Sequence, residues 1–154
     1  MFRYVSYWSN EATWGGEFLP MDDDTLYIPA GLNLLMDIDS SPMLKAIIIE
    51  GSLIIPPDSD PNHIRTLDAY YIFIRSGFME VGTEEFPYTS KIIITMYGNK
   101  ESPEIPIYGN KVIGVRYGTL DMHGVERVPS WTELETTVMP GSSTITLVRS
   151  VDWK

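Results

Sequence analysis

Two side chains in this sequence are suited to acid–base chemistry, the carboxylate of Asp121 and the imidazole of His123. They lie two positions apart, and side chains two apart in a β-strand point to the same face. A carboxylate beside an imidazole can take part in proton transfer near neutral pH. The same geometry would also let His123 hydrogen-bond across a turn at Gly124. We favour this structural role and treat the pair as weak catalytic candidates.

Acidic residues cluster in two places where oxygen ligands for calcium could gather. One is the run Asp22, Asp23 and Asp24, and the other is the pair Asp37 and Asp39 about one repeat later. Stacked repeats would bring Asp24 close to Asp37, but the sequence has no glycine-rich calcium loop. We therefore expect a solvated acidic edge and no required cofactor. Asp37 and Asp39, about 7 Å apart on one strand face, also meet the spacing of glycosidase carboxylates, as many chance pairs do.

Aromatic residues are numerous enough to line a carbohydrate-binding surface, because aromatic side chains offer broad faces with a polar edge. The four tryptophans are Trp8, Trp14, Trp131 and Trp153, and there are nine tyrosines. Tyrosine is equally common in the packed strands of a core, so a sugar platform is one interpretation of two. The second histidine, His63, follows a polar, turn-rich segment at 56–62 and is expected at the surface.

Composition excludes several classes of function. There are 21 acidic and 11 basic residues, and the formal net charge of −10 would repel the phosphates of a nucleic acid. Cysteine is absent, which excludes a thiol nucleophile, thiolate metal ligands and disulfides. No apolar run reaches the roughly 18 residues that cross a bilayer.

The elements that would position these side chains are short β-rich runs, each followed by a glycine and a second short run. The segments 47–55 and 71–82 are examples. The expected corner glycines are Gly31, Gly51, Gly77, Gly98 and Gly118, which follow one another at steps of 20, 26, 21 and 20 residues. Gly141 continues the series after a further 23 residues. Gly82 and Gly124 are also expected at corners, each at the end of a β-rich run. A period of roughly 20–25 residues predicts a solenoid whose coils turn at glycine.

This spacing predicts an all-β fold, a right-handed stack of parallel β-coils resembling a β-helix, in a single domain spanning 1–154. The long step of 26 residues contains the turn-rich segment 56–62, which we interpret as an insertion. The alternative is an antiparallel β-sandwich or jelly roll. Turns in such folds usually recur every 8–12 residues or so, about half the spacing seen here.

Read with their flanking residues, these corners resemble the eight-glycine (G-eight) domain of fibrocystin-like proteins and cell-surface hyaluronidases. The most specific match is Gly118–Gly124 followed by Ser130–Thr132, which is similar to the family pattern G-x-L-x-L-H-G … S-W-T. Leu26–Gly31 and Met79–Glu84 resemble two further family segments, and Ile105–Val112 is most similar to fibrocystin-like members. The resemblance covers nearly the whole chain. The family's glycine before its first acidic residue is missing near Asp22, which affects the first turn.

The resemblance implies a non-catalytic extracellular module of a large fibrocystin-like cell-surface protein. Its expected partners are the other domains of that ectodomain and a carbohydrate or protein ligand, with membrane attachment only through the anchor of the parent protein. Two alternatives remain open: the N-terminal domain of a hyaluronan-depolymerising enzyme, and a structural element of a cell-surface or ciliary filament. Relatives continue with further coils, so we expect 1–154 to be a fragment, capped near Trp8 and Trp14 and open at its other end.

Overall fold

The computed structural model describes residues 4–16 and 18–153, which belong to two compact units. The first unit, Met1–Gly124, contains every named strand, and the second is Val125–Lys154. The expectation of a single domain spanning 1–154 stays a prediction. Among the described residues, no helix is long and apolar enough to cross a membrane.

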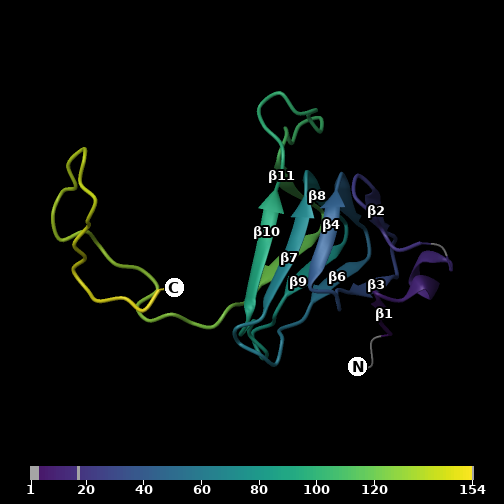
Figure 1. Cartoon of the computed structure of the whole chain (residues 1–154), viewed down its shortest axis with the longest axis horizontal. Helices are drawn as coiled ribbons and strands as arrows, with labels where there is room; N and C mark the ends of the chain where they lie inside the picture. Colours follow the sequence, from purple (N-terminus) through teal and green to yellow (C-terminus); the bar gives the residue numbers. More distant parts are fainter. Residues whose placement is uncertain (1–3, 17, 154) are drawn as a thin grey trace. The chain divides into compact units, whose positions relative to one another are not determined.

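Three β-sheets make up the first unit (Figure 1). The five-stranded sheet has the order β1-β3-β6-β9-β12, the four-stranded sheet β11-β8-β5-β2, and the three-stranded sheet β10-β7-β4. The strands are β1 Ser6–Tyr7, β2 Thr25–Ile28, β3 Asn33–Leu35, β4 Ser40–Leu44, β5 Ala46–Ile49, β6 Ser52–Ile55, β7 Ile64–Ala69, β8 Tyr71–Arg75, β9 Phe78–Val81, β10 Lys91–Met96, β11 Val112–Arg116 and β12 Thr119–Met122, with one 3-10 helix, η1 Glu11–Trp14.

Successive strands enter the three sheets in rotation. From β2 onward, each strand pairs with the strand three places further along the chain, so β2 pairs with β5, β5 with β8 and β8 with β11. All nine ladders between named strands are parallel. The predicted all-β fold with parallel strands is therefore confirmed, and the antiparallel sandwich does not fit.

The core lies between the sheets and is built from alternate residues of each strand. Ile47 and Ile49 in β5 are fully buried, and they stand in register with the equally buried Ile72 and Ile74 in β8. Burial of such a side chain stabilises the fold by about 1.5–3 kcal/mol. β-branched residues suit these positions because they pack well on a pleated surface.

The two ends of the stack differ. At the start, Trp8 is 1% exposed and its ring meets Trp14 edge-on, with centroids 6.0 Å apart. At the other end β10, β11 and β12 are the last strands of their sheets. Val115 and Leu120, which stand in register with the fully buried Ile74 and Met79, are 42% and 36% exposed. The core is therefore closed by tryptophan at one end and loosens at the other.

Glycine is needed at the corner between the four- and five-stranded sheets because stacked backbones approach closely there. A Cβ on Gly77 would lie 2.5 Å from the carbonyl oxygen of Ile49 and 2.7 Å from that of Gly51. A Cβ on Gly118 would lie 2.6 Å from the carbonyl oxygen of Gly77. Neither Gly77 nor Gly118 has a positive φ; Ser76, just before Gly77, has one of 63°.

Gly51, Gly77 and Gly118 stack on one another at this corner and form a glycine column, to which Gly98 does not belong. It follows β10 at the corner between the three- and four-stranded sheets, and Gly141 lies in the second unit. The coil that begins at Gly77 closes at Gly118, so its length is 41 residues and not two steps of about 20. Of the other expected corners, Gly31 lies between β2 and β3, and Gly82 and Gly124 follow β9 and β12.

The second unit has no named strand or helix in its described part. An isolated antiparallel bridge joins Leu134 and Leu147. The indole N–H of Trp153 donates to the carbonyl oxygen of Pro129 (2.8 Å), and the Arg149 guanidinium lies 5.5 Å from the centre of the Trp131 ring.

Candidate functional site

The structure brings the two acid–base candidates together. Nε2 of His123 lies 2.7 Å from Oδ1 of Asp121, and both side chains are a little over one-third exposed. The backbone of His123 is fixed on both sides, because its N–H donates to the carbonyl oxygen of Val81 (2.9 Å) and its own carbonyl oxygen accepts from the N–H of Tyr88 (2.7 Å). The pair thus sits at the end of the last strand of the five-stranded sheet.

A shallow hollow of about 260 Å³ lies beside this pair and is open to solvent. Besides His123 it is lined by Tyr88, Ser90 and Lys91 among others. The Ser90 hydroxyl accepts a hydrogen bond from the N–H of Asp58 (3.2 Å), so it is already used to hold a loop. The described lining contains no second carboxylate and no arranged pair of N–H donors for a developing oxyanion.

The calcium candidates are separated from one another. Asp24 lies just before β2, whereas Asp37 follows β3 at a different corner, so stacking does not bring them together. Asp24 accepts a hydrogen bond from the N–H of Met21, and Asp22 accepts one from the N–H of Met43, each at 2.8 Å. In the described parts of the chain, no group of three or more His or acidic residues could hold a metal ion.

Asp37 binds the start of the chain instead. Its two oxygens accept hydrogen bonds from the hydroxyl of Ser9 and from the Ser9 N–H, the latter at 2.9 Å. Partial burial of the carboxylate raises its pKa, but these hydrogen bonds outweigh burial and hold the pKa below its ordinary value. This contact ties the segment that carries Trp8 to the end of β3.

His63 is less exposed than expected. Its side chain is 23% exposed, and Nε2 lies 3.2 Å from Oδ1 of Asp39. The neighbouring Arg65 is buried, and its guanidinium donates to the carbonyl oxygens of Ile38 (3.0 Å) and Pro56 (2.7 Å). The insertion at 56–62 is therefore fastened to the stack, and this buries the histidine that follows it.

A charged ladder on the outside of the four-stranded sheet was missed in the sequence. The hydroxyl of Tyr27 donates to Glu50 (2.6 Å), and Glu50 pairs with Arg75. The hydrogen bond lowers the pKa of Glu50, with help from Arg75, and it raises the pKa of Tyr27. Glu50 is one residue before Gly51, whereas Arg75 is two residues before Gly77. If the repeats are aligned on their corner glycines, Glu50 and Arg75 fall at different positions, so the alignment does not predict that they pair.

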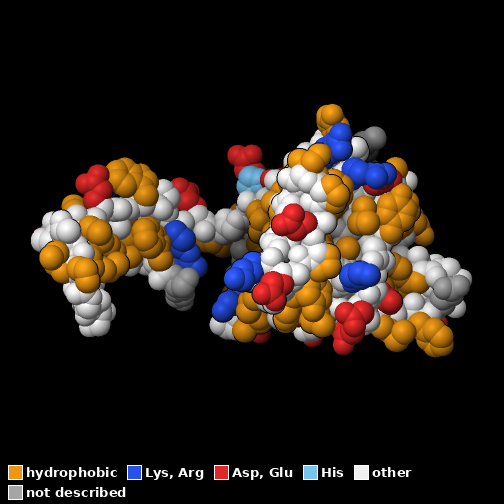
Figure 2. Space-filling view, turned by 90° about the horizontal axis from the view of Figure 1, so that it is seen from above, with side chains coloured by type: hydrophobic (Ala, Val, Ile, Leu, Met, Phe, Trp, Pro, Cys, Tyr) orange, Lys and Arg blue, Asp and Glu red, His pale blue; other side chains and the backbone are white. Residues whose placement is uncertain are grey.

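The predicted tryptophan platform is only partly available. Trp8 and Trp14 close the core, so neither offers a free face there. Trp131 and Trp153 are about half exposed and lie in the second unit. The surface in Figure 2 shows Lys and Arg side chains in several separate places and no single basic patch on that face.

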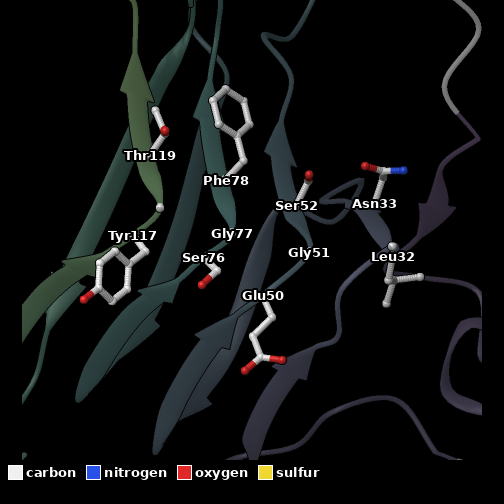
Figure 3. A pocket seen from close by; sticks show the side chains of 12 residues that line it. Leu32, Asn33, Glu50, Gly51, Ser52, Ser76, Gly77, Phe78, Tyr117 and Thr119 are labelled. Atoms are coloured by element: carbon white, nitrogen blue, oxygen red, sulfur yellow. The ribbon is translucent and has the colours of Figure 1, made fainter.

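The corner glycines form the floor of an open groove of about 340 Å³ (Figure 3). Asn33, Ser52, Phe78 and Thr119 form one row of side chains across it, and Glu50, Ser76 and Tyr117 lie along the other side. The groove crosses four strands of the five-stranded sheet. Its floor is backbone, so its shape depends on the glycine column.

Fold and site together define an all-β domain of parallel sheets with glycine corners and an open Asp–His pair. The chain belongs to the G8 domain family, whose model matches residues 13–135. The resemblance noted in the sequence is thereby confirmed.

The chain is 38% identical over 154 residues to Fibrocystin-L of Homo sapiens, covering 99% of this chain and 4% of that protein. It is 33% identical over 154 residues to Fibrocystin of Mus musculus, with the same two shares covered. It is also 31% identical over 122 residues to the cell migration-inducing and hyaluronan-binding protein of Mus musculus, covering 77% of this chain and 9% of that protein. The chain thus spans a small part of the relatives it matches.

Proposed function

We propose that this chain is a non-catalytic extracellular module of a larger fibrocystin-like cell-surface protein, and that it presents ligand-binding surfaces on a rigid stack. In this proposal the three sheets are the faces of a right-handed parallel β-helix. The rotation of successive strands through the sheets supports the helix, and parallel crossovers are overwhelmingly right-handed. The expected ligands are a carbohydrate or a protein, and the other domains of the parent are expected as neighbours.

The observation that carries the non-catalytic proposal is the setting of His123. Its imidazole is paired with Asp121 on an open face, and its backbone is hydrogen-bonded on both sides. Catalytic groups ordinarily work in a site that excludes water and supplies further polar groups aimed at the reacting atoms. The hollow beside His123 is open and offers neither in the described residues. A structural role in holding the turn at Gly124 accounts for these three interactions of His123.

The test is incubation of the chain with high-molecular-mass hyaluronan, followed by gel analysis of its size. We expect no shortening by the chain or by its His123→Ala variant. Asp39 and His63 form the other acid–histidine pair of the described chain, so His63→Ala is a matched control. Shortening that is lost in His123→Ala and kept in His63→Ala would overturn the proposal.

That outcome would favour the second candidate, the N-terminal domain of a hyaluronan-depolymerising enzyme. The 2.7 Å contact between Asp121 and His123 is the observation that supports it. Similarity to a protein named as hyaluronan-binding adds weight. Because this chain covers 9% of that relative, the same assay on the full-length parent belongs in the experiment.

A further inference from the structure

A second hollow, of about 360 Å³, lies at the corner where the three-stranded sheet leads into the four-stranded sheet. It is lined by Asp23, Lys45, Tyr70, Tyr71, Ser102 and Pro103. This volume lies near the lower end of the range of small-molecule sites, which is roughly 300–1,000 Å³. The hollow has no part in the acid–base pair, the charged ladder or the glycine groove.

The stack itself fixes one wall of this hollow. Lys45 and Tyr70 are the single residues that connect β4 to β5 and β7 to β8. The N–H of Lys45 donates to the backbone carbonyl oxygen of Asp24 (2.9 Å), and the N–H of Tyr70 donates to that of Leu44 (3.0 Å), so the two corners stand one above the other. The ring of Tyr70 also packs against Tyr97, with centroids 6.0 Å apart.

The opposite wall is the long connection between β10 and β11, residues 97–111, which Figure 1 shows rising above these strands. It is anchored at several points. The Tyr71 hydroxyl donates to the carbonyl oxygen of Pro103, and the Ser102 hydroxyl accepts from the N–H of Asn99 (2.9 Å). Tyr108 packs on Phe73 with ring centroids 5.0 Å apart. The hollow is therefore bounded by two structured elements.

The chemistry of the lining is aromatic with balanced charge. Tyr70 and Tyr71 supply two broad rings, and Tyr71 offers only its ring because its hydroxyl already binds Pro103. Asp23 and Lys45 contribute one charge of each sign, and neither forms an ion pair with another described residue. A ligand that fits must offer an apolar face to the rings and hydrogen-bonding groups to both charges.

We infer that this hollow binds an uncharged sugar ring of a glycan. A pyranose has an apolar C–H face for the tyrosines, and its hydroxyls can donate to the Asp23 carboxylate and accept from the Lys45 ammonium. A purely apolar ligand would strip water from both charges without replacing their hydrogen bonds. A polyanion would be drawn to Lys45 but repelled by Asp23 and by the net charge of −10.

This inference rests on the proposed function of a binding module and names its ligand class. The probes are the neutral tetrasaccharides of mannose, glucose and N-acetylglucosamine, and the anionic tetrasaccharide of hyaluronan. Each is titrated at millimolar concentration into the isotopically labelled chain and followed by NMR. We expect at least one neutral probe to shift the amide signals of Lys45, Tyr70 and Tyr71. We expect the hyaluronan probe to bind at least about tenfold more weakly, which corresponds to about 1.4 kcal/mol.

Variants assign the binding to the hollow. Tyr70→Leu removes one ring and should weaken neutral-probe binding about three- to tenfold. Lys45→Gln alters an exposed side chain outside the core, so a loss of neutral-probe binding in this variant reports the missing ammonium group and not a change in packing. Tyr117→Leu is the matched control, because Tyr117 is 84% exposed at the other end of the four-stranded sheet. Asp23→Lys should reverse the preference toward the hyaluronan probe.

A deletion tests the outer wall. Removing residues 98–111 leaves Tyr97 as the single connecting residue between β10 and β11, as Lys45 and Tyr70 are in the two preceding coils. The deletion should keep the β-sheet circular dichroism and lose neutral-probe binding.

The inference is overturned if no neutral probe binds, if the shifts map elsewhere, or if Asp23→Lys leaves the preference unchanged. Binding that maps to the groove of Figure 3 would overturn this site and leave the proposed function standing. Shortening of hyaluronan in the assay above would overturn the proposed function, whereas the NMR map would still report on the site.

Discussion

Replacement of Gly77 by alanine tests whether close backbone approach holds the corner together. The added Cβ would lie 2.5 Å from the Ile49 carbonyl oxygen and 2.7 Å from that of Gly51. Both neighbours are backbone atoms, since Ile49 ends β5 and the Gly51 carbonyl oxygen accepts from the N–H of Phe78 (2.9 Å). Neither can move without disturbing the hydrogen bonds around it. Overpacking of this kind costs about 1–3 kcal/mol, and we expect the upper part of that range. The conformation itself adds nothing, because φ at Gly77 is not positive.

The measurement is urea denaturation followed by tryptophan fluorescence, with Gly124→Ala as the matched control. A Cβ on Gly124 meets nothing within 4 Å, and its φ is also not positive. The control should therefore change the free energy of unfolding by no more than about 0.5 kcal/mol. For Gly77→Ala a loss near 3 kcal/mol corresponds to a fall of roughly 6–12 °C in Tm. Equal stability of the two variants would refute the close-approach argument.

Three further predictions concern charged contacts. The folded-state pKa of Asp37 lies below its ordinary value of 3.8, so its contribution is complete above that pH and is lost as pH falls through the folded value. Asp37→Ala should cost about 0.5–1.5 kcal/mol at neutral pH, because its hydrogen bonds to Ser9 are solvent-exposed, and it should flatten this acid dependence in a denaturation series; an unchanged series would contradict it. Glu50→Gln should bring the raised pKa of Tyr27 back toward 10.0 in an ultraviolet or NMR titration, and a pKa that stays raised would exclude Glu50 as the cause. Arg65→Met should cost about 2–4 kcal/mol in urea, since two backbone carbonyls lose buried charged donors, and a neutral effect would show that apolar packing compensates.

Much of the fold follows from local signals that the sequence carries openly. The pattern of a glycine between two β-rich runs identifies Gly51, Gly77 and Gly118 as corners. Only glycine fits there, because any side chain would clash with the backbone of the preceding coil. The parallel pairing follows from the length of chain between corners, which is too long for a hairpin. The pairing of Asp121 with His123 follows from strand alternation alone.

The missed features depend on offsets that spacing does not reveal. Asp24 and Asp37 differ by little more than half a coil, so they fall at different corners and cannot meet. Arg75 reaches Glu50 because Ser76 adds one residue, at φ 63°, before the corner glycine. His63 is covered because Arg65 draws the preceding insertion onto the stack. Each case is set by one or two residues of turn geometry.

The misplacement of Gly98 and the inferred sugar site have the same origin. One connecting residue suffices between the three- and four-stranded sheets, as Lys45 and Tyr70 show. The third such connection is longer by residues 98–111, and it begins with a glycine at φ 104° that falls almost midway between Gly77 and Gly118. A corner that needs one residue can accept many, because the ladders on both sides are already paired and loop length costs little entropy. Close backbone packing at Gly51, Gly77 and Gly118 therefore fixes how the coils stack at the corner between the four- and five-stranded sheets. The connections between the three- and four-stranded sheets are free to vary in length, and side chains that could recognise a ligand are added there.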